Sequence, residues 1–186
     1  PLIHYSLDAL YSAGISDIAV VVGHQAEKIR AALEDTYPFI EFIYNERHNG
    51  GNALSVRAAS AFVSDEPFVV CMGDHPISPD IVQCLLSDER DGCVLCVDPD
   101  AWHPSQMDDA TRVLVDPGSY ILNIGKHLKV WNATDTGVFK MTPSVFPAIE
   151  LLMSRRGNQV SITDIVRSLG DGGQPFATCD VGGMFW

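Results

Sequence analysis

The chain has 186 residues, 46% of them hydrophobic, which is typical of one folded domain with a substantial core and not of a disordered or fibrous protein. Its 12 basic and 24 acidic residues give a net charge of −12. Binding to nucleic acid or to an anionic membrane surface needs clustered Lys and Arg, so this charge argues against both classes. A phosphate-bearing ligand must then be bound by a few placed cations, by backbone amides or by a metal.

Apolar periodicity predicts that helices and strands alternate over the first 100 residues. Segments with helical spacing of apolar residues are separated by short valine-rich or aromatic runs, which are typical of buried strands. In chain order, the sequence predicts a helix over 2–13, a strand over 17–23, a helix over 24–37, a strand over 39–45, a helix over 51–63, a strand over 68–72, a helix over 78–87 and a strand over 92–97.

After residue 100 the pattern changes. Residues 111–126 contain two strand-like runs around the turn sequence Asp116-Pro117-Gly118-Ser119, which predicts a β-hairpin. The rest of the chain predicts a strand over 135–141, helices over 143–156 and 161–170, and a strand over 175–181.

The alternation of helices with strands that are apolar on both faces predicts an α/β fold. We expect a three-layer α/β/α, Rossmann-like domain with a mostly parallel sheet and a β-hairpin insertion. Residues 1–186 are expected to belong to this single domain.

Five cysteines, an odd number scattered among hydrophobic runs, do not make the even framework of a small secreted scaffold and indicate a reducing, cytoplasmic compartment. Cys93 and Cys96 form a C-x-x-C, but they lie in a strand-like run without a second pair, so buried structural thiols are favoured over a zinc or redox site. No apolar run approaches the ~20 residues of a membrane span, and no signal peptide is visible. The chain does not begin with Met, so we expect residues upstream of Pro1.

Asp74 directly follows the predicted strand 68–72, with Gly73 before it and His75 after it. In open α/β sheets, ligands bind beyond the carboxyl ends of the strands, so Asp74 is expected to project into the binding site. Its carboxylate could hold a divalent metal that bridges the oxygens of a polyphosphate, and Gly73 would allow close backbone approach. The alternative is that Asp74 caps the next helix, but Ser78 is better placed for that role.

His75 has two interpretations. With an ordinary pKa near ~6.5 it could contact phosphate or move a proton. A histidine beside a strand end is as often a hydrogen-bonded structural group, so we do not assign it as a catalytic base.

The loop in "NERHNGGNALSV", residues 45–56, joins a predicted strand to a predicted helix. Gly50 and Gly51 permit close backbone approach, Asn52 carries an amide that donates and accepts, and the new helix presents free N–H groups. These features suit a nucleotide base or phosphate. Taken alone, the two glycines favour a simple turn over a binding loop, because any strand-to-helix loop can contain them.

The stretch "NIGKHLKVWNATDTGVFK", residues 123–140, holds a third group of polar residues. Lys126 could neutralise the phosphate of an acceptor, while Asp135 and Thr136, followed by Gly137, could hydrogen-bond its hydroxyls. Surface lysines are common, however, and Lys129 is interpreted as one of these.

Five segments in order, "GGNALSV", "FVVCMGDH", "IGKHL", "DTGVF" and "SITDIV", resemble the nucleotidyltransferases of the nucleotide-diphospho-sugar transferase fold, a superfamily with MobA-like and sugar-phosphate nucleotidyltransferase members. The resemblance covers nearly all of the chain. Within this superfamily the chain is most similar to the CTP:inositol-1-phosphate cytidylyltransferases, followed by phosphocholine cytidylyltransferases and sugar-1-phosphate nucleotidyltransferases.

The resemblance implies a role for each matched residue. Asp74 would bind a catalytic Mg²⁺, and Gly50, Gly51, Asn52 and Gly73 would bind the nucleotide. The phosphorylated acceptor would contact Lys126, which would also be catalytic, together with Asp135, Thr136 and Gly137. The acceptor phosphate would attack the α-phosphorus of a nucleoside triphosphate, with CTP and inositol-1-phosphate favoured, and pyrophosphate would leave.

Two features of the family are not found in the chain. Family members begin with a strand and a glycine-rich loop that wraps the triphosphate, whereas "PLIHYSL" resembles the helix that follows them. Members also follow a tryptophan like Trp186 with an acidic motif that supplies a second metal ligand. The resemblance therefore implies an internal portion of a longer enzyme, incomplete at both ends and without its first strand, and we expect this portion alone to be inactive.

Other interpretations remain open. "GDHPISPDIV" also resembles molybdenum-cofactor-type nucleotidyltransferases, and a non-catalytic nucleotide-sensing domain of the same fold is a further alternative. A related glycosyltransferase would usually carry two aspartates around one residue, whereas this chain has Asp74 only. No nucleic-acid partner is expected, and membrane association would come only from a fused C-terminal phosphotransferase domain.

Overall fold

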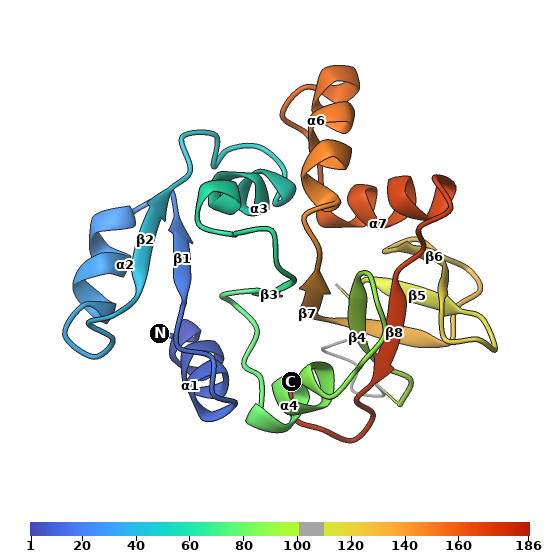
Figure 1. Cartoon of the computed structure of the whole chain (residues 1–186), viewed down its shortest axis with the longest axis horizontal. Coiled ribbons are helices and arrows are strands. Elements are labelled where there is room, and N and C mark those ends of the chain that lie inside the picture. The colour runs from blue at the N-terminus through green and yellow to red at the C-terminus, as the bar shows by residue number, and fades with distance from the viewer. Residues whose placement is uncertain (101–109) are drawn as a thin grey trace.

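The computed structural model describes residues 1–100 and 110–186 (Figure 1). Its helices are α1 (Ile3–Ser12), α2 (Ala26–Leu33), α3 (Ala53–Ala58), α4 (Pro79–Leu86), α6 (Val145–Arg156) and α7 (Ile162–Asp171), and a 3₁₀ turn, Ala59–Ala61, follows α3. The strands are β1 (Ala19–Val22), β2 (Glu41–Tyr44), β3 (Phe68–Cys71), β4 (Val94–Asp98), β5 (Arg112–Val115), β6 (Ile121–Gly125), β7 (Ala133–Met141) and β8 (Ala177–Asp180).

The described strands form two sheets. β1 and β2 make a parallel pair of their own. The six-stranded sheet has the order β6-β5-β7-β4-β8, and β3 joins it by pairing with β7. β3, β4 and β5 all pair antiparallel with β7, and β8 pairs parallel with β4, so β3, β4, β5 and β8 run in one direction. β7 and β6 run in the opposite direction. The α/β fold with a central sheet is confirmed. The prediction of a mostly parallel sheet is wrong for the described six-stranded sheet: only β4 and β8 pair parallel in it, because β7 runs antiparallel to each of its neighbours.

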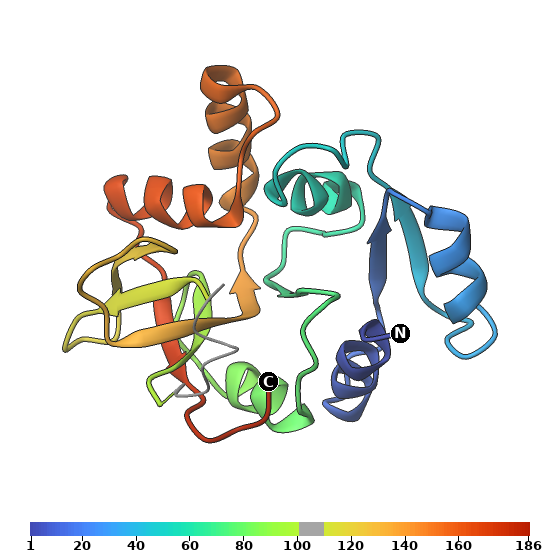
Figure 2. The same ribbon diagram turned by 180° about the vertical axis from the view of Figure 1, so that it is seen from behind.

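Helices cover both faces of the six-stranded sheet (Figures 1 and 2). The side chains of β4, which point alternately to the two faces, show why. Val94 and Cys96 pack toward α1 and α4, whereas Leu95 and Val97 pack toward α3, α6 and α7. Successive side chains of a strand point to opposite faces, so a strand that is apolar at every position needs a cover on each side. A third hydrophobic cluster lies between α1, α2 and the β1–β2 pair.

The predicted hairpin is confirmed: β5 and β6 pair antiparallel, and the backbone N–H of Ser119 donates to the carbonyl oxygen of Asp116 in the turn. α7 begins with a capping box, in which Ser161 and Asp164 each bond the other's backbone N–H. Ser78 stands at the N-cap position of α4 with Pro79 after it, as predicted, but its hydroxyl makes no capping hydrogen bond.

Two strand edges face each other without a bridging strand. Within the described residues, β1 pairs with β2 alone and β3 pairs with β7 alone. Across both views the strands follow one another in the order β2, β1, β3, β7 (Figures 1 and 2). The gap in hydrogen bonding between the two sheets therefore lies beside the end of β3, where the candidate site begins.

Candidate functional site

The pairing of β3 with β7 brings two acidic residues together. Cys71 pairs with Val138, and the backbone N–H of Met72 donates to the carbonyl oxygen of Gly137 over 3.1 Å. Asp74 and Asp135 come just beyond this ladder, one after the end of β3 and the other within β7. The register therefore places both carboxylates at the same end of the β3–β7 pair.

His75 connects the two strands at this point. Its Nδ1 atom lies 3.1 Å from the backbone oxygen of Thr136, and its Nε2 atom lies 4.0 Å from Oδ1 of Asp74. The loop that carries His75 is held from the other side by Ser6 of α1, whose buried hydroxyl lies 3.1 Å from the His75 carbonyl oxygen. The loop is thus anchored by polar contacts on both sides.

Asp74 itself remains open to solvent, with 80% of its side chain exposed. Gly73 is exposed as well, and an added Cβ there would meet only Ile3, at 3.7 Å. Packing within the chain does not require glycine at this position. Close approach of a ligand, as predicted from the sequence, would require it.

Asp135 sits in a contrasting environment. Desolvation by burial raises the pKa of its carboxyl from 3.8 to about 6, against the opposing effects of a hydrogen bond from the backbone N–H of Gly137, at 2.8 Å, and of nearby His75. A bound cation stabilises the charged form of a poorly solvated carboxylate more than it stabilises that of an exposed carboxylate. The pair therefore combines an accessible carboxylate, Asp74, with a partly desolvated one.

Gly137 is required by the geometry of the site. Its φ of +79° is a conformation that glycine adopts readily, and a Cβ added there would lie 2.5 Å from Nδ1 of His75 and 2.8 Å from Cγ of Met72. Thr136, by contrast, is fully buried, and its hydroxyl donates to the carbonyl oxygen of Cys96 over 2.9 Å. Its side chain is thus used in the sheet, and its backbone oxygen is what faces His75.

Several basic side chains lie at the end of the β5–β6 hairpin opposite its turn. β6 ends at Gly125, which pairs with Arg112 of β5, and Arg112 in turn pairs with Thr134 of β7. Lys126, exposed and directly after Gly125, therefore emerges at the same end of the strands as Asp135. Lys129 is exposed in the same loop.

Arg167 of α7 joins this group, and sequence reasoning did not find it. A Cβ added to Gly125 would lie 2.4 Å from Nη2 of Arg167, so the guanidinium lies against the backbone just before Lys126. Arg167 follows the "SITDIV" segment on an amphipathic helix, where an exposed arginine is unremarkable in sequence terms. Only the packing of α7 against β6 indicates that it belongs here.

The structure accounts for Gly50 and Gly51 by packing. A Cβ on Gly51 would lie 2.0 Å from the carbonyl oxygen of Val160, and one on Gly50 would lie 2.5 Å from that of Asn158. Asn52 accepts a hydrogen bond at Oδ1 from the backbone N–H of Ile162, over 2.8 Å. The loop is therefore joined to the segment before α7, and its contact with a nucleotide stays a prediction.

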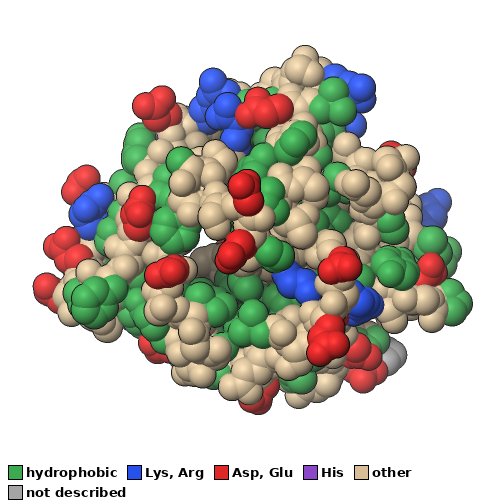
Figure 3. Space-filling view, viewed as in Figure 1, with side chains coloured by type: hydrophobic (Ala, Val, Ile, Leu, Met, Phe, Trp, Pro, Cys, Tyr) green, Lys and Arg blue, Asp and Glu red, His purple; other side chains and the backbone are tan. Residues whose placement is uncertain are grey.

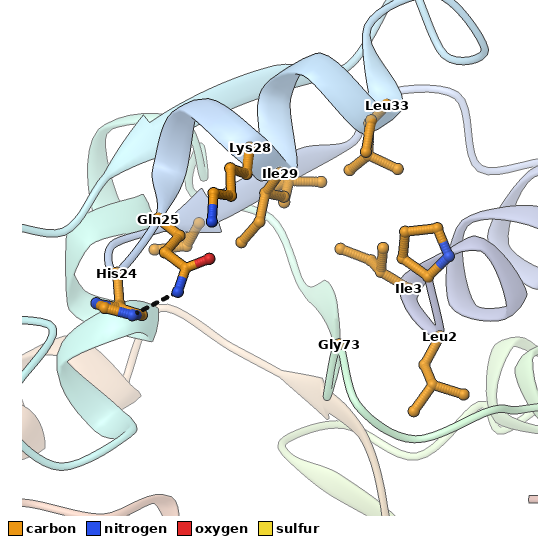
Figure 4. Close-up of a pocket in the computed structure, with 12 residues that line it drawn as sticks. Leu2, Ile3, His24, Gln25, Lys28, Ile29, Leu33 and Gly73 are labelled. Atoms are coloured by element: carbon orange, nitrogen blue, oxygen red, sulfur yellow. Dashed lines mark hydrogen bonds between the residues drawn. The ribbon is translucent and has the colours of Figure 1, made fainter.

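A cavity of about 540 Å³ lies between the β1–α2 unit and the start of the site loop (Figure 4). Figure 3 shows the surface hollowed here, with hydrophobic side chains on its floor. At one end of the cavity His24 and Gln25 hydrogen-bond each other over 2.9 Å, close to Lys28 of α2. The remaining wall is largely apolar and includes Ile3, Val20, Val21, Ile29, Leu33 and Gly73.

The residues at the β3–β7 end fit a metal that keeps several non-protein ligands. In the part of the chain that the structure describes, no three His, Cys, Asp or Glu side chains gather as a metal-binding group. Mg²⁺ commonly uses one or two carboxylates together with waters and substrate phosphates. Asp74 and Asp135 match that requirement, whereas they would not form a closed structural site.

Comparison with known proteins identifies a matching domain family and several relatives by sequence. The MobA-like NTP transferase domain matches residues 1–160. The chain is 33% identical over its whole length to a bifunctional IPC transferase and DIPP synthase of Rubrobacter xylanophilus, and covers 41% of that protein. It is 26% identical, again over its whole length, to a glucose-1-phosphate thymidylyltransferase of Streptomyces antibioticus, and covers 53% of it. The chain thus spans about half the length of these curated relatives, or less.

Solved structures share the fold. The inositol-1-phosphate CTP transferase of T. maritima superposes with a TM-score of 0.87 at 23% identity, covering 100% of this chain and 74% of that one. A UDP-glucose pyrophosphorylase superposes with a TM-score of 0.76 at 15% identity, covering 97% of this chain and 78% of that one. Among the described helices, none is long and apolar enough to cross a membrane.

Proposed function

Because the chain belongs to the MobA-like NTP transferase domain family, we propose that it transfers a nucleotidyl group from a nucleoside triphosphate to a phosphorylated alcohol or sugar phosphate and releases pyrophosphate. The observation that carries this proposal is the meeting of Asp74 and Asp135 at one end of the β3–β7 pair, with Lys126 and Arg167 at the same end of the neighbouring hairpin. Carboxylates for a metal and cations for a phosphate are the two groups that this reaction needs.

Asp74 and Asp135 are the residues that would hold Mg²⁺. When bound, the ion supplies positive charge that neutralises the phosphate oxygens of the nucleotide. His75 orients the Asp74 loop through its bond to the Thr136 backbone oxygen, and Gly137 leaves the room that His75 occupies.

The acceptor phosphate is proposed to bind Lys126 and Arg167. Two cations there would draw a dianionic phosphate to the end of β7, so that its oxygen attacks the α-phosphorus in line with the departing pyrophosphate. Asp135 is proposed to contact the body of the acceptor, while Thr136 and Gly137 shape this end of β7 through their contacts with His75. In a chain with a net charge of −12, such a local basic pair is one means of attracting an anion.

The nucleotide is proposed to lie between the loop of Gly50, Gly51 and Asn52 and the end of β3 at Gly73. We further propose that residues 1–186 are part of a longer nucleotidyltransferase domain, in which one more strand lies between β1 and β3 and carries the triphosphate-binding loop. The support is the pair of strand edges that the described residues leave unpaired, and the largely apolar cavity lined by β1 and by Gly73 just after β3. The described portion alone is then expected to be inactive.

CTP and inositol-1-phosphate are the favoured substrates, because the structural relative with a TM-score of 0.87 is an inositol-1-phosphate CTP transferase. A sugar-1-phosphate acceptor is the second candidate, supported by the relative from Streptomyces antibioticus, which is a glucose-1-phosphate thymidylyltransferase. A molybdenum-cofactor-type activity and a nucleotide-sensing role without catalysis stay as further alternatives. The cytoplasm stays the expected compartment.

The test is pyrophosphate release by the full-length protein with Mg²⁺, each of the four common NTPs, and inositol-1-phosphate, phosphocholine or a hexose-1-phosphate. We expect release with CTP and inositol-1-phosphate, and its loss in Asp74→Asn. Asp80→Asn is the matched control, because Asp80 is also an exposed carboxylate and lies in the first turn of α4. Nucleotide binding without turnover for any acceptor would favour the sensing role.

A further inference from the structure

A cluster of thiols lies on the face of the sheet that α4 covers, outside the proposed active site. Cys96 of β4 and Cys179 of β8 are buried neighbours in the parallel β4–β8 register. Cys84 of α4 packs over them, and its Sγ lies 2.8 Å from Sγ of Cys179. All five cysteines of the chain are free thiols in this structure.

The C-x-x-C of the sequence does not form this cluster. Cys93 lies on the opposite face of β4, where its sulfur accepts a hydrogen bond from the backbone N–H of Thr142 over 3.4 Å. Cys93 is therefore a structural thiol, as the sequence predicts. The thiol pair in close contact, Cys84 and Cys179, is separated by 95 positions in the chain and joins two different elements.

We propose that Cys84 and Cys179 are a redox modification site, which hydrogen peroxide converts to a disulfide that links α4 to β8. A disulfide bond is ~2.05 Å long, so the two sulfurs, now 2.8 Å apart, need to approach by less than about 1 Å. Cys84 is partly exposed at the rim of α4, whereas Cys96 is fully buried, so peroxide reaches the pair from the Cys84 side.

Hydrogen bonds from the neighbouring thiols favour a thiolate at Cys179. The bond from Cys96 lowers the pKa of Cys179 to about 6, and the bond from Cys84 and the nearby Arg90 support this, whereas burial and the charge of Asp88 oppose it. Arg90 donates to the carbonyl oxygen of Thr178 over 2.7 Å and forms an ion pair with Asp88. Thiolates, and not thiols, are the nucleophiles in peroxide oxidation, so Cys179 is the attacking group.

The reaction balances with one peroxide. The Cys179 thiolate attacks a peroxide oxygen, the O–O bond breaks, and the leaving hydroxide takes a proton to become water. The sulfenic acid on Cys179 is then attacked by Cys84 as it loses its proton; the S–S bond forms, the S–O bond breaks, and a second water leaves. Two thiols are oxidised by two electrons, and one hydrogen peroxide is reduced to two waters.

The site is tested on the full-length protein by brief peroxide treatment, trapping of free thiols with N-ethylmaleimide, digestion and mass spectrometry. We expect one new linked peptide pair, Cys84 with Cys179, that dithiothreitol reverses. The linkage closes a long loop, so the melting temperature should rise by about 5–10 °C. In Cys84→Ser both the linked pair and the rise should vanish, whereas Cys93→Ser, on the other face, should keep both.

Three results would overturn the proposal: both thiols alkylated after peroxide, a disulfide formed by Cys96 with either of them, or linkage only between two chains. Cys84→Ser changes a partly exposed side chain, so circular dichroism of the untreated variant should match that of the wild type.

Discussion

His75 donates a hydrogen bond from Nδ1 to the backbone carbonyl oxygen of Thr136, over 3.1 Å. A carbonyl oxygen only accepts, so the proton of a neutral His75 is on Nδ1, and Nε2 is the atom turned toward Asp74, at 4.0 Å. This arrangement supports the structural interpretation of His75 that the sequence left open. The ring positions the loop of the candidate site, and its unprotonated nitrogen faces Asp74.

Replacing His75 should therefore cost less activity than replacing Asp74. For Asp74→Asn, which removes a charge that would face the metal, we expect turnover to fall by roughly 100-fold or more. For His75→Ala we expect a fall of about tenfold, arising mainly from a weaker apparent Mg²⁺ affinity as the loop loosens. Turnover measured against Mg²⁺ concentration separates the two effects. Equal losses in kcat at saturating Mg²⁺ would assign His75 a direct chemical role.

Asp135 should make stability depend on pH. Its carboxyl holds a proton up to about pH 6 in the folded protein, against the usual 3.8, so the native state binds more protons than the unfolded state between these values. The free energy of unfolding then falls as pH rises through this window, by at most about 3 kcal/mol from this group. In Asp135→Asn that decrease should be absent.

The measurement is urea unfolding of both proteins without metal, at about pH 4 and about pH 7. Relative to the wild type, Asp135→Asn should gain stability between the two conditions. Added Mg²⁺ should stabilise the wild type more at the higher pH, where the carboxylate is charged, and should have little effect on the variant. A parallel pH dependence of the two proteins would contradict the raised pKa of the Asp135 carboxyl.

Two glycines of the site should respond differently to alanine. At Gly137 a Cβ meets His75 at 2.5 Å in a backbone of φ +79°, so Gly137→Ala should lower the free energy of unfolding by about 2–4 kcal/mol. At Gly73 the nearest contact is an ordinary 3.7 Å, so Gly73→Ala should change stability by no more than about 0.5 kcal/mol.

The activity of the Gly73→Ala variant tests whether Gly73 belongs to the nucleotide site. If Gly73 admits a nucleotide phosphate, Gly73→Ala should raise the KM for the nucleotide while the melting temperature stays unchanged. An unaltered KM would remove Gly73 from the nucleotide site and leave it as a loop residue.

Arg167 and Lys126 should act on the acceptor more than on the nucleotide. For Arg167→Met and Lys126→Met, each of which removes a charge from a phosphate contact, we expect the KM for the acceptor to rise by roughly ten- to a hundredfold, equivalent to about 1.5–3 kcal/mol. The KM for the nucleotide should change little. Lys129→Met is the matched control from the same exposed loop. An effect of Lys129→Met as large as that of Lys126→Met would indicate general attraction of anions by the loop.

The parts of the fold that local patterns determine were predicted well. Strands such as β4, which is apolar from Val94 to Val97, and the Asp116–Ser119 turn carry their structure in a few consecutive residues. The predicted helix over 24–37 is shorter in the structure, ending at Leu33, because the chain turns to bury Tyr37 against α1. Periodicity alone cannot locate such an end, since it depends on a contact with a distant helix.

The site itself was predicted only residue by residue. The sequence indicated Asp74 at a strand end and Asp135 on a later strand, but an apolar strand has the same pattern whether its neighbour is parallel or antiparallel, so the β3–β7 register that joins them was not foreseen. Arg167 and the Cys84–Cys179 contact depend on helix packing across long stretches of sequence. The glycines at 50 and 51 were noticed, but their packing against the segment before α7 was not.

Helix α1 touches both halves of the molecule. Leu7 is buried with the β1–β2 pair, and Ala9 is buried with α4 beneath the six-stranded sheet. Since the described residues show no backbone ladder between the two sheets, amide hydrogen exchange should resolve two cooperatively opening units, with α1 as the element that couples their opening. Weakening α1 at Ala9 should uncouple the units before it melts either one.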